Sequence, residues 1–262
     1  MTQRPPRFPL VLGRVARTVQ QRALPTTATQ RAAVPLPAVP APSGVGLDSQ
    51  HVRSRMVERL RAHGLTCRPV IDALAHVPRH QFVDAALVAQ AYEDTSLPIG
   101  HGQTISKPSV VARMLSLLFD ARAGAPHLGR VLEIGTGCGY QAALLAQMAT
   151  LVISVERLRP LHDKARDNLA SMRRSNLRLV YGDGRLGHAP NAPYDGIVCA
   201  AGGEDLPQAW LDQLAIGGRL VAPTQADGRG DQVLVTVDRH ENGWSRHERD
   251  AVRFVPLRSG TA

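Results

Sequence analysis

The chain has 262 residues, of which 44% are hydrophobic, and its formal net charge at pH 7 is +9. This length is enough for one domain with a substantial buried core, and no apolar run approaches the roughly 20 residues that a membrane-spanning helix needs. The three cysteines (Cys67, Cys138 and Cys199) lie far apart without a C-x-x-C pair, which excludes an evident disulfide framework or cysteine metal site and favours a cytoplasmic protein with reduced thiols.

Residues 1–48 are rich in Pro, Ala, Thr and Arg and contain few large apolar side chains after Val15. Such a segment buries too little apolar surface to offset the entropy of ordering, so the sequence predicts a disordered extension. Its Arg-rich, acid-poor composition leaves an organelle transit peptide open as an alternative, but the apolar run at residues 8–13 is too short for a signal-peptide core.

The positive charge is unevenly distributed along the chain. Residues 1–50 contribute a net charge of +5, which leaves only +4 for the rest of the chain. Nearly all of this charge comes from arginine, since Lys107 and Lys164 are the only lysines. A concentrated basic surface is the usual footprint of a nucleic-acid-binding protein. The distribution weakens that interpretation, and we expect no obligatory nucleic-acid partner.

Three helices are predicted in the N-terminal part of the ordered chain, residues 49–125. Apolar residues recur there at helical spacing, and Gly64 and Pro78 are placed to end the first two helices. The first predicted helix contains Met56, Val57 and Leu60 and ends at Gly64, and the other two cover residues 70–77 and 110–119.

From residue 131 onward, predicted strands and helices alternate. The strands are expected at residues 131–134, 151–155, 177–181, 195–200, 218–222, 232–238 and 251–255, and the helices at residues 139–148, 158–173 and 207–214. This alternation is typical of an open, doubly wound, mostly parallel α/β sheet with helices on both faces. No helix separates the last two strands, so we expect an antiparallel hairpin at one edge. The sequence therefore predicts a seven-stranded sheet in residues 126–262, within one domain of residues 49–262.

A glycine-rich turn follows the first of these strands, in the segment V-L-E-I-G-T-G-C-G-Y. Gly135, Gly137 and Gly139 permit a tight turn and close approach of a ligand, and the helix that follows offers free N–H groups. Glu156 ends the second strand, at the distance where a carboxylate reaches ribose hydroxyls. Without the G-x-G-x-x-G pattern of pyrophosphate sites, the turn favours an adenosine ligand such as S-adenosylmethionine. An NAD or FAD site, or a turn without a ligand, remains the alternative.

Several further motifs occur in a definite order along residues 53–258. The chain reads V-P-R-H-Q-F-V-D at residues 77–84, L-P-I-G-H-G-Q-T-I-S-K-P at 97–108, S-V-E-R-L at 154–158, G-D-G at 182–184 and R-F-V-P-L at 253–257. Together with the glycine turn, this series resembles the protein-L-isoaspartate O-methyltransferase family, which belongs to the class I methyltransferases. The G-Q-T-I-S segment is the most specific part of the resemblance.

The resemblance implies an activity and its reagents. Members of the family transfer a methyl group from S-adenosyl-L-methionine to the free α-carboxylate of L-isoaspartyl residues in damaged proteins and peptides, releasing S-adenosyl-L-homocysteine. A carboxylate is already an anion at neutral pH, so the reaction needs placement of the reactants more than a general base. We therefore expect no metal site, no membrane partner, and a monomer that acts on isoaspartyl-containing proteins and peptides.

The resemblance also implies roles for individual residues. Ser106 matches the active-site serine, although a serine before Pro108 could also cap a helix. Thr104 and Ile105 are expected to line the donor pocket with Ser106. The expected donor contacts in the sheet are the glycine loop with Thr136, then Glu156 for the ribose with its neighbour Arg157, and Asp183 with Gly184 for the adenine; Asp183 could instead belong to an ordinary Asp-Gly turn.

Two further segments carry expectations from the resemblance. Glu133, a charged residue within an apolar strand, is expected to order the glycine loop or bind the donor's ammonium group, or else to make a purely structural hydrogen bond. Residues 253–257 are expected to form the last strand, beside which an extended substrate peptide could lie. The segments 200–205 and 225–231 depart from the family pattern, because they are unusually polar and rich in glycine.

Other functions remain possible on the same fold. A class I methyltransferase could instead act on a small molecule or on nucleic acid. The segment C-A-A-G at residues 199–202 lacks the [N/D/S]-P-P-[Y/F] motif of enzymes that methylate base nitrogens, and no general base for a hydroxyl substrate is evident. A non-catalytic nucleic-acid-binding module is the remaining alternative, against which the intact G-Q-T-I-S segment, glycine turn and Glu156 argue.

Overall fold

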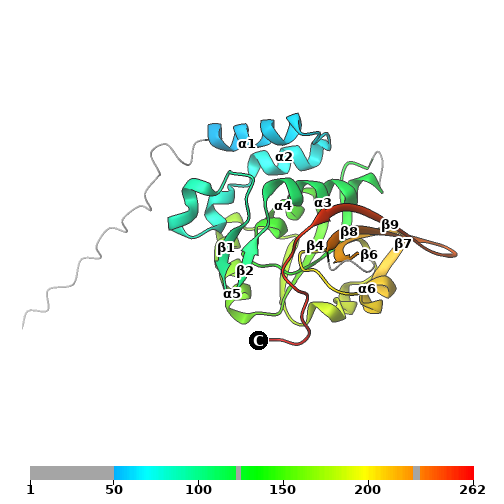
Figure 1. The fold of residues 1–262 in the computed structure, drawn as a ribbon. Coiled ribbons are helices and arrows are strands. Elements are labelled where there is room, and N and C mark those ends of the chain that lie inside the picture. Colours follow the sequence, from blue (N-terminus) through cyan, green and yellow to red (C-terminus); the bar gives the residue numbers. More distant parts are fainter. Residues whose placement is uncertain (1–49, 122–124, 227–230) are drawn as a thin grey trace, which may run out of the picture. The chain divides into compact units, whose positions relative to one another are not determined.

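A computed structural model describes residues 50–121, 125–226 and 231–262. The extension predicted to be disordered, residues 1–48, lies outside these ranges. The described chain forms an α/β structure in which helices pack against both faces of one large sheet (Figure 1). This arrangement confirms the predicted fold class.

The sheet has seven strands in the order β5-β4-β3-β6-β7-β8-β9. The first five of these run parallel, and β8 pairs antiparallel with both β7 and β9. In chain order the strands are β3 (Leu128–Ile134), β4 (Ala149–Glu156), β5 (Leu177–Tyr181), β6 (Tyr194–Cys199), β7 (Leu214–Gln225), β8 (Gln232–His240) and β9 (Gly243–Val252). The predicted edge hairpin is thus present as β8 and β9.

Two cores lie on opposite faces of this sheet, because successive residues of a strand point to opposite faces. Val131 belongs to the larger core and its neighbour Leu132 to the smaller one. The larger core is built with α1 (Gln50–Ala62), α2 (Arg68–His76), α3 (Pro108–Asp120), α4 (Tyr140–Met148) and α5 (Arg159–Leu169). The smaller core is covered by α6 (Gln208–Gln213), where Trp210 is buried and donates to the carbonyl of Gly184.

A small antiparallel hairpin, β1 (Leu97–Gly100) and β2 (Gln103–Ile105), precedes α3 and was not expected from the sequence. Its strands are only four and three residues long, and Pro98 lies within the first, so no alternating apolar pattern marks them. Its tight turn has positive φ at three consecutive residues, including 54° at His101. The hairpin brings Thr104 and Ile105 to the carboxyl ends of the parallel strands, where ligands bind in such folds.

The last strand differs from its predicted position. Residues 251–255 were expected to form it, but β9 ends at Val252 and residues 253–257 leave the sheet. The observed strand is strongly charged and its side chains are mostly exposed, so it lacks the apolar alternation by which strands are found in a sequence. Residues 253–257 cross the carboxyl ends of the parallel strands, where Pro256 forms an isolated β-bridge with Gly202 (Figure 1).

The three cysteines are free thiols, which agrees with the absence of a disulfide framework in the sequence pattern. Burial raises the pKa of Cys138 to about 11 and that of Cys199 to about 12, so both remain protonated and behave as small packed residues. Among the described residues, no helix is both long enough and apolar enough to cross a membrane.

Candidate active site

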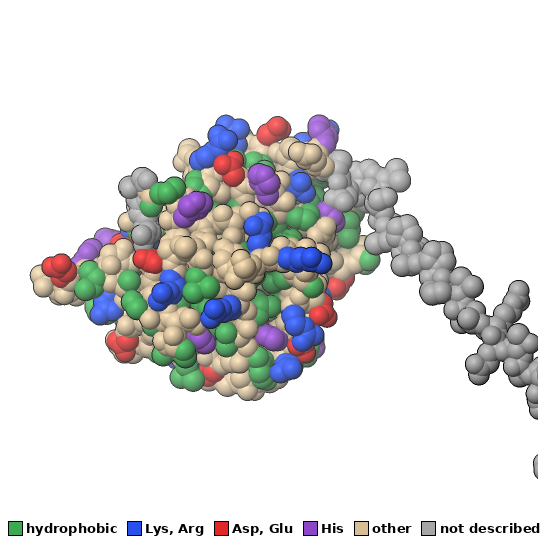
Figure 2. All heavy atoms as spheres, turned by 180° about the vertical axis from the view of Figure 1, so that it is seen from behind, with side chains coloured by type: hydrophobic (Ala, Val, Ile, Leu, Met, Phe, Trp, Pro, Cys, Tyr) green, Lys and Arg blue, Asp and Glu red, His purple; other side chains and the backbone are tan. Residues whose placement is uncertain are grey.

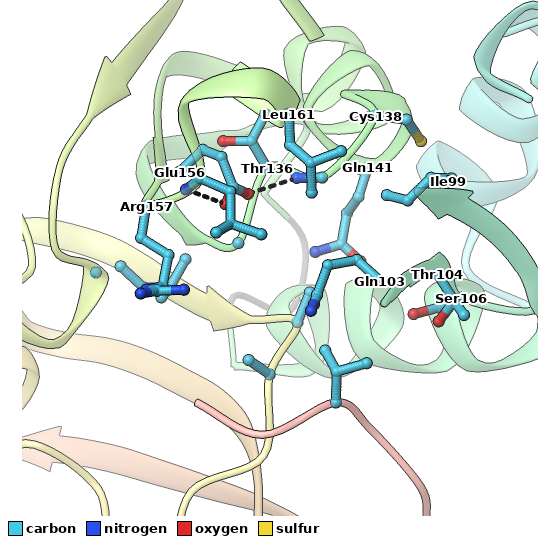
Figure 3. A pocket seen from close by; sticks show the side chains of 18 of the residues that line it. Ile99, Gln103, Thr104, Ser106, Thr136, Cys138, Gln141, Glu156, Arg157 and Leu161 are labelled. Atoms are coloured by element: carbon cyan, nitrogen blue, oxygen red, sulfur yellow. Dashed lines mark hydrogen bonds between the residues drawn. The ribbon is translucent and has the colours of Figure 1, made fainter. Parts of the chain in front are cut away.

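A pocket opens at the carboxyl ends of β3, β4 and β6, beside the β1–β2 hairpin, and has a cavity volume of about 100 Å³. Nine of the expected donor-site residues line it: Thr104, Ile105, Ser106, Gly135, Thr136, Gly137, Glu156, Arg157 and Gly184. In Figure 3, Glu156 and Arg157 lie at one end of the pocket and Thr104 and Ser106 at the other, with Gln141 between them. Three expected residues, Glu133, Gly139 and Asp183, lie next to the pocket without lining it.

The glycine turn has the close packing that its sequence predicts. Its three glycines have φ values of 88°, 56° and 92°, a region that other residues rarely adopt. A Cβ on Gly139 would lie 2.9 Å from the Leu169 side chain, so this glycine lets α5 pack against the turn. Gly139 therefore shapes the loop from behind, while Gly135 and Gly137 face the pocket.

Glu156 is held by the backbone of the loops it faces. One carboxylate oxygen accepts from the Gly137 N–H at 2.9 Å and the other from the Leu158 N–H at 2.9 Å (Figure 3). The side chain is only 5% exposed, yet it lines the pocket. A carboxylate can accept about four hydrogen bonds, so acceptor capacity remains for hydroxyl groups of a ligand. A ribose-binding role for Glu156 stays a prediction that this geometry permits.

Glu133 lies beneath the pocket in a fully buried chain of hydrogen bonds. The Ser154 hydroxyl donates to Glu133 at 2.5 Å, and the hydroxyls of Ser154 and Thr136 are 2.6 Å apart. Burial raises the pKa of Glu133 to about 8, so it carries a proton at neutral pH. Its Oε1 atom and the Gln141 amide nitrogen are both buried without a hydrogen-bond partner among the described residues. Glu133 thus reaches the pocket through Thr136, which agrees with an ordering role for the loop.

Asp183 is engaged by the chain's last described segment. One of its carboxylate oxygens accepts from the Arg185 N–H at 2.9 Å and the other from the Gly260 N–H at 2.6 Å. The Gly260 carbonyl in turn accepts from Arg157 Nε at 2.8 Å. An adenine-binding role for Asp183 stays a prediction, and in this structure the residue anchors the segment that covers one end of the pocket.

Ser106 lies where two hollows meet. Thr104, Ser106, Ala200 and Val255 line both the donor pocket and an adjoining hollow, which extends toward α3 and the end of β9. We name it the acceptor hollow because the sequence predicted the substrate peptide beside residues 253–257. The alternative role of Ser106 as a helix cap is not observed, since the cap position of α3 is Lys107 and no side chain caps it. Ser106 is therefore available to a ligand at the junction.

A buried arginine holds the segment that carries Ser106. Arg79, in the short 3-10 helix Arg79–Phe82, is fully buried and donates to the carbonyls of Ala91 and Ser106, each at 2.8 Å. Its guanidinium also lies 4.9 Å from the ring centre of Tyr140, which lines the donor pocket. The V-P-R-H-Q-F-V-D motif, which has no expected ligand contact, thus supports the active-site segment from behind.

Sequence reasoning missed a set of lining residues that are mostly apolar. They come from the β1–β2 hairpin, from α3, α4 and α5, from the ends of β3 and β4, and from the segments after β3, β4, β6 and β9. These residues are Ile99, Gln103, Val111, Ile134, Cys138, Tyr140, Gln141, Val155, Leu158, Leu161, Ala200, Ala201 and residues 255–258. Apolar residues that line a pocket follow the same periodicity as core residues, so no signal separated them. Pro256, Leu257 and Arg258 belong to the donor pocket, although the substrate side was expected for residues 253–257.

The parallel sheet, the glycine turn and the pocket at the carboxyl ends of the strands define a class I methyltransferase fold with its ligand site. Residues 51–262 match the family model described as protein-L-isoaspartate(D-aspartate) O-methyltransferase. The chain belongs to this family.

Individual relatives agree with this assignment. The chain is 60% identical over 266 residues to a protein-L-isoaspartate O-methyltransferase of Methylibium petroleiphilum, covering 99% of this chain and 98% of the relative. It is 65% identical over 221 residues to the protein of that name from Leptothrix cholodnii, covering 84% and 78%. A solved structure of a protein-L-isoaspartate O-methyltransferase superposes with a TM-score of 0.70 at 27% identity, covering 78% of this chain and 65% of the other. The fold is also shared, with a TM-score of 0.68 at 24% identity, by a putative Plasmodium falciparum enzyme in complex with S-adenosyl-L-homocysteine, covering 79% and 98%.

Proposed function

We propose that this protein transfers a methyl group from S-adenosyl-L-methionine to the free α-carboxylate of L-isoaspartyl residues in damaged proteins and peptides, releasing S-adenosyl-L-homocysteine. Family membership supports the activity. The observation that carries the mechanism is the junction at Thr104 and Ser106, which both the donor pocket and the acceptor hollow share. A methyl group presented there can meet a carboxylate that enters from the other side.

The residues at the junction are suited to placing the reactants. A carboxyl group has a reference pKa near 4, so the substrate is already nucleophilic at neutral pH. The hydroxyls of Thr104 and Ser106 can donate hydrogen bonds to it, and hydrogen bonds to a charged group are the stronger kind. The chain's contribution is then to align carboxylate oxygen, methyl carbon and sulfur, which is catalysis by proximity and orientation.

Different residues of the pocket bind different parts of the donor. Glu156, held by two backbone N–H groups, offers its remaining lone pairs to the ribose, while Gly135 and Gly137 allow the methionine portion to approach the backbone. Arg157, Gly184 and the neighbouring Asp183 lie toward the adenine end. Thr104 and Ile105 close the donor site on the side of the hairpin.

We further propose a cytoplasmic monomer without an obligatory nucleic-acid or membrane partner. On the face seen in Figure 2, Lys and Arg side chains are spread out and have acidic and other residues between them, rather than forming one continuous patch. Nucleic-acid binding depends on such a continuous basic patch or stripe. The less specific proposal, a class I methyltransferase for a small molecule or nucleic acid, has no comparable support in the site.

The test is methyl transfer from labelled S-adenosyl-L-methionine to paired peptides that differ only in L-isoaspartate or normal aspartate. In the aspartyl peptide the carboxylate and the backbone carbon exchange places, and a shift of about 1 Å can cost roughly a hundredfold in rate. We expect label in the isoaspartyl peptide and little or none in its isomer. Equal rates on both peptides would exclude the repair activity and require another acceptor.

A further inference from the structure

Residues 253–257 form the wall between the donor pocket and the acceptor hollow. Arg253 and Phe254 line the acceptor hollow, Val255 lines both, and Pro256 and Leu257 line the donor pocket. The wall has left the sheet, because β9 ends at Val252. Its position must therefore be fixed by contacts other than a continuous strand ladder.

At the acceptor end of the wall, the Gln232 side chain hydrogen-bonds the backbone. Gln232, the first residue of β8, accepts a hydrogen bond from the Phe254 N–H at 2.6 Å and donates from its amide nitrogen to the Phe254 carbonyl at 3.2 Å. A glutamine amide presents one acceptor and two donors, so it can satisfy both backbone groups of one extended residue as a neighbouring strand would.

The donor end of the wall is held by different contacts. The Gly202 N–H donates to the Val255 carbonyl at 2.8 Å, and the Leu257 N–H donates to the Gly202 carbonyl at 2.7 Å. Beyond the wall, Gly260 is bonded to Asp183 and to Arg157. None of these hydrogen bonds involves the Gln232 side chain, so each end of the wall has hydrogen bonds of its own.

Position 202 must be glycine because the Gln232 side chain occupies the space that a Cβ would need. A Cβ on Gly202 would lie 2.4 Å from Gln232 Nε2 and 2.7 Å from its Cδ. Any larger residue at position 202 would displace the amide from Phe254. Gly202, which lies in the segment 200–205 that departs from the family pattern, thus packs directly against the Gln232 amide.

We propose that Gln232 is a positioning residue for the acceptor: its amide fixes Arg253 and Phe254, and through them the fit of the substrate peptide, with little influence on donor binding. This inference rests on the proposed function. It gives the glycine at position 202 and the glutamine at position 232 a shared role in substrate specificity.

The decisive variant is Gln232→Leu, with Gln225→Leu as its matched control. Gln225 lies directly opposite Gln232 on β7, its side chain is exposed, and it has no side-chain hydrogen bond among the described residues. We expect Gln232→Leu to raise KM for an L-isoaspartyl peptide about tenfold, the effect of losing one to two net hydrogen bonds, and to leave donor affinity by calorimetry within about twofold of the control.

A second variant, Gln232→Glu, separates hydrogen bonding from shape. Glutamate fills the same space and still accepts from the Phe254 N–H, but it cannot donate to the Phe254 carbonyl. Amide hydrogen exchange at Phe254 should therefore stay slow in Gln232→Glu and become fast in Gln232→Leu, while KM for the peptide rises in both. If Gln232 acted only through its packing, Gln232→Glu would have the same KM for the peptide as the wild type.

The inference is wrong if Gln232→Leu has the same KM for the peptide as Gln225→Leu. It is also wrong if Gln232→Leu loses as much donor affinity as peptide affinity, or if amide hydrogen exchange at Phe254 stays unchanged in this variant. The wild-type protein serves as the separate check on the function. If it does not methylate the isoaspartyl peptide, the proposed function is refuted and the acceptor role with it. If it does, the variants decide the role of Gln232 alone.

Discussion

Ser106 is the residue on which the proposed chemistry depends most directly. It lines both the donor pocket and the acceptor hollow, and its backbone is fixed by Arg79. We expect Ser106→Ala to lower kcat about tenfold to a hundredfold, because a hydrogen bond to a charged group contributes about 1.5–3 kcal/mol, and to change donor affinity much less. Steady-state kinetics and calorimetry would show this split. Ser109→Ala, one turn farther along and outside the junction, is the matched control.

Glu156 has both carboxylate oxygens engaged by backbone N–H groups. Glu156→Ala removes the group expected to bind the ribose and also releases Gly137. We expect the dissociation constant for S-adenosyl-L-methionine to rise about tenfold to a hundredfold, in line with the loss of charge-assisted hydrogen bonds. Calorimetry gives the constant, and Glu58→Ala, an exposed helical position, controls for the lost charge. Unchanged affinity would remove Glu156 from the donor site.

Glu133 makes the stability of the folded protein depend on pH. Its pKa is about 8 when folded and near 4.5 when it is solvated, so between these values the folded state holds a proton that the unfolded chain has released. The stability of the folded state should therefore fall as pH rises from about 4.5 to about 8 and then level off, at about 1.4 kcal/mol per pKa unit. Thermal unfolding of wild type and Glu133→Gln across this window should show a steeper loss of stability with rising pH in the wild type, because the other titrating groups are common to both proteins. If stability depended on pH in the same way in both proteins, Glu133 would not be protonated in the folded state.

At the scale of elements, α5 and the glycine turn form one packed unit through Gly139. Gly139→Ala combines a positive φ of 92° with a contact of 2.9 Å to Leu169. Gly64→Ala has nearly the same φ, 97°, but no atom within 4 Å of the new Cβ, so it isolates backbone strain. We expect Gly64→Ala to cost about 1 kcal/mol and Gly139→Ala about 1–3 kcal/mol more, measured by denaturant unfolding. Equal losses would mean that the contact with α5 is easily relieved.

Elements with a strong local pattern were predictable, and those defined by tertiary contacts were not. An apolar run predicts the strand at Val131, and the glycine turn predicts the helix after Gly139. The β1–β2 hairpin is too short to show a period, and the charged strand β9 shows no apolar face. Residues 254–257 are apolar and therefore look like a strand in the sequence, but they lie outside the sheet and line the two hollows.

The same distinction holds within the site. Glu156 and the glycines could be placed from the sequence because their spacing from the strands fixes where they lie. The contacts of Asp183 with Gly260 and of Gln232 with Phe254 join positions 77 and 22 residues apart. No local rule links such pairs, since their proximity arises only when the segment after β9 folds back over the strand ends.

For the whole molecule, the sequence predicts that residues 1–48 are dispensable. Their composition offers little apolar surface for packing, and the family model begins to match only at residue 51. A variant that starts at Gln50 should keep the melting temperature and the peptide-methylation rate of the full chain. Differential scanning calorimetry and the labelled-donor assay would measure both. A loss of either would show that the extension contributes to the folded enzyme.

The charged edge strand β9 affects how the enzyme interacts with partly unfolded substrate chains. An edge strand presents unpaired N–H and C=O groups, which can template the addition of another chain. β9 carries Arg246, His247, Glu248, Arg249 and Asp250 in succession, all exposed. Substrates that have aged or partly unfolded expose strand-forming segments of their own, which tend to aggregate. The desolvation of these charges opposes such pairing, so the enzyme can meet damaged chains at its pocket without recruiting them to its sheet.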